Sequence, residues 1–87
     1  MKKLKVRLLE MQDVTLPIRT EYIKLDSALK LSGVAETGGH AKELVEKGAV
    51  RVNGEVCVSR GKKLYPGDSF EFKALRYTIA KEPDEAE

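Results

Sequence analysis

The sequence predicts a small α+β domain in which two short helices pack on a small, mainly antiparallel sheet. Two consecutive segments repeat apolar residues at the spacing of helices, and the later segments alternate apolar and polar residues with the period of strands. Asn53 and Gly54 lie between two of these alternating segments, and this dipeptide is the strongest short signal for a β-hairpin. The 87 residues suffice for one folded domain.

The N-terminal part is expected to contribute a strand and a connector. Apolar residues alternate with lysine and arginine over residues 3–9, which predicts a strand with one face in the core. Pro17 and its polar neighbours indicate a connector or an irregular edge over residues 10–20. Residues 21–24 predict a short second strand.

Two helices are expected in succession. The first begins near Asp26 and ends at Gly33, because glycine accepts the backbone conformation that follows a helix. The second is capped by Thr37 and ends before Gly48. Its core side is predicted to consist of Ala41, Leu44 and Val45.

The remaining chain is expected to complete the sheet. The predicted strands cover residues 50–52, residues 55–58, residues 69–73 and a last segment that contains Tyr77 and Ile79. Tyr65-Pro66-Gly67-Asp68 predicts a turn, with proline and glycine in its two central positions. We expect residues 82–87 to form a disordered acidic tail.

The charge is unevenly distributed along the chain. The net charge is +2, but residues 82–87 carry four acidic side chains and no basic one. Residues 1–81 therefore hold 16 basic and 10 acidic side chains. A basic body is typical of proteins that bind polyanions, although a well-solvated surface would look the same.

Several classes of function do not fit the sequence. The single cysteine, Cys57, allows no disulfide within the chain, and one cysteine with one histidine does not make a zinc site. We therefore expect no metal and no cofactor, and a reducing cytoplasm as the location. No apolar run is long enough to span a membrane, and no secretory signal is expected at the basic N-terminus.

The order of residues in the central stretch is informative as a whole. It consists of Leu25-Asp26, Leu29, Gly33, Gly38-Gly39, Ala41, Gly48, Val50, Val52, Asn53-Gly54 and Gly67-Asp68. This order resembles the S4 domain, an RNA-binding module, over residues 22–73. It is most similar to the stand-alone bacterial S4-like proteins of the YaaA and YbcJ type, which share the Gly-Gly pair before the second helix.

The resemblance implies a domain organisation and a binding surface. Residues 22–81 would form the S4-like domain with a helix-loop-strand RNA surface (the αL motif), residues 1–21 a preceding strand and connector, and residues 82–87 the tail. Many S4 domains carry Ser-Arg before the second helix, where this chain has Thr37 and Gly38. One expected RNA contact is therefore missing, so its role falls to other residues or the RNA target differs.

The candidate RNA-binding residues combine cations with a glycine pair at a helix start. Phosphates are bound by basic side chains and by the free N–H groups of a helix N-terminus, which glycine leaves accessible. These residues are Lys24, Lys30, Gly38, Gly39, His40, Lys42, Lys47, Arg51, Arg60, Lys62 and Lys63. We expect them to converge into one patch.

Each candidate also has a structural interpretation. Gly38-Gly39 fits a simple turn between helices equally well, and the charged residues of the second helix fit an ordinary solvated face. His40 lacks a serine, cysteine or carboxylate at a spacing that indicates catalysis. Tyr65 and Tyr77 would suit stacking on a base, but half-buried sheet aromatics are more common.

The sequence therefore predicts a non-catalytic protein that binds structured RNA, with ribosomal RNA or a ribosome assembly intermediate as the partner. No catalytic residue, small-molecule substrate or membrane partner is expected. The alternative is a small protein-protein interaction adaptor. A ubiquitin-like sulfur carrier is disfavoured, because such carriers end in Gly-Gly and this sequence ends in Glu85-Ala86-Glu87.

Overall fold

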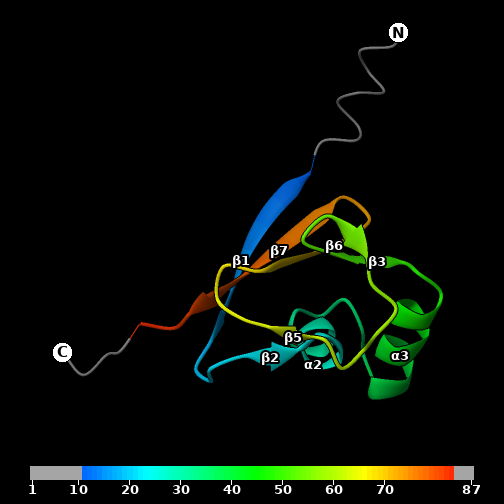
Figure 1. Ribbon diagram of the computed structural model, residues 1–87, viewed down its shortest axis with the longest axis horizontal. Helices are drawn as coiled ribbons and strands as arrows, with labels where there is room; N and C mark the ends of the chain where they lie inside the picture. The colour runs from blue at the N-terminus through cyan, green and yellow to red at the C-terminus, as the bar shows by residue number, and fades with distance from the viewer. Residues whose placement is uncertain (1–10, 84–87) are drawn as a thin grey trace, which may run out of the picture.

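The computed structural model describes residues 11–83, which form seven strands and two helices (Figure 1). In chain order they are β1 (Gln12–Ile18), β2 (Ile23–Lys24), α2 (Leu25–Leu31), α3 (Gly38–Glu46), β3 (Val50–Val52), β4 (Glu55–Val56), β5 (Lys63–Leu64), β6 (Ser69–Phe72) and β7 (Leu75–Lys81). The strand predicted over residues 3–9 lies outside the described residues. No helix among those described is long and apolar enough to cross a membrane.

Five strands form one sheet in the order β1-β7-β6-β3-β4. All neighbouring pairs are antiparallel except β1 and β7, which run parallel over seven residue pairs. β2 and β5 form a separate two-stranded antiparallel ribbon below the main sheet in Figure 1. The predicted α+β architecture, with two helices on a mainly antiparallel sheet, is confirmed.

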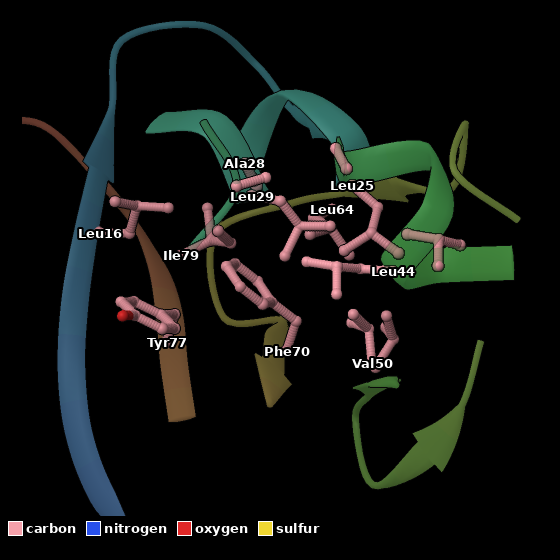
Figure 2. Packing of buried hydrophobic residues seen from close by; sticks show 14 of the residues in the cluster. Leu16, Leu25, Ala28, Leu29, Leu44, Val50, Leu64, Phe70, Tyr77 and Ile79 are labelled. Atoms are coloured by element: carbon pink, nitrogen blue, oxygen red, sulfur yellow. The ribbon is translucent and has the colours of Figure 1, made fainter. Parts of the chain in front are cut away.

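The core lies between one face of the sheet and the two helices. Figure 2 shows sheet side chains such as Phe70 and Ile79 directed toward α2 and α3, which contribute Leu29 and Leu44. Phe70 is fully buried and its ring stacks on Tyr77 with 5.0 Å between the ring centroids. No charged or polar residue is buried in the described part of the chain, so this core is held by apolar packing.

The local turn and cap signals were predicted correctly. Asn53 and Gly54 both have positive φ, 52° and 89°, as a two-residue hairpin requires. Gly67 has φ 102°, and the Asp68 amide donates to the Tyr65 carbonyl at 2.8 Å, which closes the predicted turn. The Thr37 hydroxyl accepts from the His40 amide at 3.0 Å and caps α3.

The structure distinguishes the alternatives predicted for residues 10–20. Of the two alternatives, a connector or an irregular edge, the edge is correct: residues 12–18 form the edge strand β1, because β7 supplies a parallel partner that the local sequence does not reveal. Leu16 and Ile18 from this strand are buried in the core. Pro17 is compatible with this position since an edge strand leaves one row of amides unpaired.

The C-terminal tail is attached at its first residue. The Glu82 amide donates to the Ile18 carbonyl at 2.7 Å, and the Glu82 carboxylate lies 3.0 Å from Arg19 Nε. The prediction of disorder is therefore wrong for Glu82. Residues 84–87 lie outside the described residues.

Leu64 and Leu31 form a matched pair for testing the core. Leu64 is fully buried in β5, so Leu64→Ala should lower the free energy of unfolding by about 2–5 kcal/mol. Leu31 is 57% exposed at the end of α2, so Leu31→Ala should change it by no more than about 0.5 kcal/mol. Urea denaturation followed by circular dichroism measures both. If both variants lose the same free energy of unfolding, Leu64 of the ribbon is not part of the core.

Candidate nucleic-acid interface

The two-stranded ribbon places Lys24 and Lys63 side by side. Ile23 pairs with Leu64 and Lys24 with Lys63 in antiparallel register, and directly opposed residues of such a pair share one face. Ile23 and Leu64 point into the core. Lys24 and Lys63 are both exposed on the opposite, outer face of the ribbon.

The loop before β5 is attached to the beginning of α2 through its backbone. The Leu25 amide donates to the Lys62 carbonyl at 2.9 Å, and the Asp26 amide donates to the Arg60 carbonyl at 3.0 Å. These bonds satisfy two amides at the start of α2, which begins at Leu25, one residue before the predicted start at Asp26, and has no side-chain cap. The side chains of Arg60 and Lys62 are exposed.

Ribbon and loop together therefore bring close the main chains of four of the predicted cations, which we call the basic cluster: Lys24, Arg60, Lys62 and Lys63. The side chains of Lys24 and Lys63 share the outer face of the ribbon, whereas the Lys62 side chain lines a pocket beside the β3-β4 hairpin with Asn53 and Glu55. Backbone hydrogen bonds or strand pairing fix the main chain of each of the four. None of the four forms an ion pair with a carboxylate of the described residues. No carboxylate of the described residues therefore competes with an external anion for these four side chains.

The start of α3 has an open backbone. Gly38 and Gly39 lack positive φ, and a Cβ added to Gly38 would meet nothing within 4 Å. Neither conformation nor packing therefore requires glycine at Gly38. Within residues 11–83, the amides of Gly38 and Gly39 have no hydrogen-bond acceptor, so two N–H groups at this helix N-terminus face solvent.

His40 lies in the first turn of the same helix and is exposed. Its Nδ1 accepts from the Glu36 amide at 3.4 Å, so in the neutral ring the proton resides on Nε2. Nε2 is therefore the atom that remains able to donate to an external group.

Lys42 and Lys47 do not lie together. They are five positions apart on a helix that turns by about 100° per residue, which separates their directions by about 140°. Each has a glutamate one turn away on its own flank, Glu46 for Lys42 and Glu43 for Lys47. The exposed surface of α3 thus carries mixed charge, and its two lysines project in different directions.

Arg51 does not share the face of the basic cluster. Val50 and Val52 on β3 are buried against the helices, so Arg51 projects from the opposite face of the sheet. There it lies opposite Glu71, an acid that also contacts Arg76 at 3.5 Å. Lys30 is exposed in the last turn of α2, one turn after Asp26.

Two tyrosines, Tyr22 and Tyr65, lie beside the basic cluster. Tyr65 is 43% exposed, and the centroids of the two rings are 5.5 Å apart. Tyr77, the other tyrosine considered for stacking on a base, is buried in the core. Sequence reasoning did not select Tyr22. The available signal was the mirrored pattern of Tyr22-Ile23-Lys24 and Lys63-Leu64-Tyr65, which an antiparallel pairing superimposes.

Comparison with known proteins agrees with this architecture. The sequence model of the S4 domain family matches residues 16–80. The chain is also similar to a Bacillus subtilis (strain 168) protein described as "Probable ribosome maturation protein RlbA". The two are 43% identical over 58 residues, which is 67% of this chain and 82% of that protein. The match spans most of the described sheet and both helices, and the chain belongs to the S4 domain family.

Proposed function

We propose that this protein binds structured RNA through the basic cluster and the adjoining start of α3, without catalysing a reaction. The observation that carries the proposal is the basic cluster itself. Four cations stand on a backbone fixed by strand pairing and hydrogen bonds, and none is paired with an acid of the described residues. A rigid array of this kind suits the phosphates of a folded polynucleotide.

The beginning of α3 supplies a second kind of phosphate contact. The free amides of Gly38 and Gly39 point outward at the positive end of a helix dipole, and His40 adds a donor through Nε2. These amides take the place of the arginine that many S4 domains carry at the position of Gly38. Lys30, Lys42 and Lys47 contribute at most to the general attraction, since acids accompany them.

Ribosomal RNA, or an intermediate of ribosome assembly, is the partner that we propose. Membership of the S4 domain family supports RNA as the ligand, and the similarity to a protein described as a ribosome maturation protein supports the ribosomal context. This role places the protein in the cytoplasm with no cofactor. The affinity for a protein partner would depend much less on salt concentration than the affinity for RNA. Measuring binding at several salt concentrations therefore distinguishes RNA binding from the alternative of a protein-protein adaptor.

Removing two lysines from the basic cluster tests the surface. Lys62→Ala combined with Lys63→Ala should weaken binding to fragmented ribosomal RNA at least about tenfold at 0.1 M salt. The slope of log affinity against log salt should fall by about 1.4–1.8, because two phosphate contacts are lost. Filter binding over a series of salt concentrations measures both quantities.

The matched control removes the same charge elsewhere. Lys73 lies in the turn between β6 and β7, and Arg51 projects from the face of the sheet opposite the helices. The Arg51→Ala, Lys73→Ala variant should bind nearly as well as the wild type. If the two double variants lose affinity equally, the basic cluster is not the binding surface.

Gly38→Ala separates binding from folding. A methyl group at this position meets no neighbour and favours the helix, so the free energy of unfolding should stay the same or rise by up to about 1 kcal/mol. RNA affinity should nevertheless fall about fivefold, because the methyl group hinders approach to the amides. Gly33→Ala should show the reverse pattern. Because φ at Gly33 is 87°, this variant should have a lower free energy of unfolding, while the folded protein should keep its affinity for RNA. Full affinity of Gly38→Ala would remove the α3 N-terminus from the site.

A further inference from the structure

Two tyrosines and two lysines form a compact array on the outer face of the ribbon. The antiparallel register joins Ile23 to Leu64 and Lys24 to Lys63, and its continuation by one residue brings Tyr22 opposite Tyr65. The ring centroids of the tyrosines are 5.5 Å apart, with 48° between the ring planes. Because side chains alternate along a strand, the tyrosines share their face with the two lysines. We call these four residues the tyrosine-lysine array.

The two rings are not part of the core. Tyr65 is 43% exposed and Tyr22 is half-buried, whereas Phe70 and Tyr77 are 0% and 8% exposed and stack with 16° between their planes. Within the described residues, neither the Tyr22 nor the Tyr65 hydroxyl has a hydrogen-bond partner. Core packing therefore does not account for aromatic side chains at Tyr22 and Tyr65.

The backbone holds Tyr65 in place. Its amide donates to Asp68 Oδ2 at 2.8 Å, and its carbonyl accepts from the Asp68 amide at 2.8 Å. Tyr65 is thus the first residue of a closed turn that continues with Pro66 and Gly67. On the other strand, Tyr22 directly precedes Ile23, which packs against the core. Both rings are presented from fixed backbone, which reduces the entropy that a ligand must offset.

The charges select the chemistry of the ligand. Lys63 Nζ lies 4.9 Å from the centroid of the Tyr22 ring, and Lys24 stands opposite Lys63. Ammonium groups at this distance repel a cationic ligand, so a cage for a methylated amine is excluded. An apolar side chain would gain nothing from them. A ligand that is both planar and negatively charged can contact the tyrosine rings and the lysine ammonium groups together. A nucleotide is such a ligand, because it combines an aromatic base with a phosphate.

We propose that the tyrosine-lysine array binds one unpaired nucleotide of the RNA, with the base stacked on Tyr65, the tilted Tyr22 ring supporting Tyr65, and the adjacent phosphate held by Lys24 and Lys63. The inference rests on the proposed RNA-binding function and narrows it. Paired bases are enclosed in the helix and cannot stack on a protein ring, whereas a bulge, loop or end exposes one. The RNA target then contains an unpaired nucleotide next to a helical segment that the rest of the basic cluster contacts.

Two RNA duplexes that differ by one nucleotide test this inference. One is fully paired with blunt ends, and the other contains a single unpaired adenosine bulge in the same sequence. The wild-type protein should bind the bulged duplex about fivefold or more tightly, because one stacked base is gained. Tyr65→Leu and Tyr22→Leu should bind both duplexes with the affinity that the wild type shows for the paired one.

Two control variants separate stacking from other losses. Tyr65→Phe keeps the ring and should retain the preference for the bulge. Phe72→Leu removes an aromatic ring in β6 of the main sheet, whose centroid lies 5.3 Å from Lys73 Nζ. This variant should also retain the preference for the bulge, and circular dichroism checks that it is folded. A 2-aminopurine base in the bulge should lose fluorescence when the wild type binds, but not when Tyr65→Leu binds.

The outcomes distinguish the two proposals. If the wild type binds both duplexes equally and in a salt-dependent manner, RNA binding stands and the stacking site is rejected. A Tyr65→Leu variant that keeps the preference, or that weakens both duplexes by the same factor, also rejects it. If the wild type binds neither these duplexes nor fragmented ribosomal RNA, the proposed function fails together with the inference.

Discussion

The burial of Ile23 and Leu64 beneath the β2-β5 ribbon is the contact on which the proposed binding surface depends. It joins segments about 40 residues apart in sequence through strands of only two residues each. A ribbon this short is not stable in isolation, so its pairing requires the apolar anchor that Leu64 provides in the core. Once the anchor is buried, Lys24 and Lys63 necessarily face outward, and the loop carbonyls meet the amides at the start of α2.

The charge distribution makes the two faces of the main sheet differ. On the face away from the helices, one cross-strand row reads Asp13, Arg76, Glu71 and Arg51 from β1 to β3. Arg76 contacts both acids, at 3.1 and 3.5 Å, so the charges of this row largely neutralise one another. The cations of the ribbon have no comparable pairing with acids of the described residues.

Local sequence signals predicted most of the elements, because turns and helix ends are decided by a few adjacent residues. Asn53-Gly54, Thr37 and the Pro66-Gly67 turn are examples, since backbone conformation and capping act within four residues. The pairing of β1 with β7 was missed because a parallel partner leaves no local mark. Local sequence could name candidate cations but not their arrangement. The direction of Arg51 follows from the buried valines on either side, and the position of Tyr22 in the ribbon follows only from its distant partner.

The parallel pairing of β1 with β7 has a consequence for biosynthesis. Asp13 contacts Arg76 across 63 positions, and Glu82 joins Ile18 and Arg19 just beyond the paired strands. The edge strand emerges early during translation, but the strand beside which it belongs is made last. Leu16 and Ile18 must therefore stay without their native cover until nearly the whole domain has left the ribosome, and the closing of this edge is expected to complete folding.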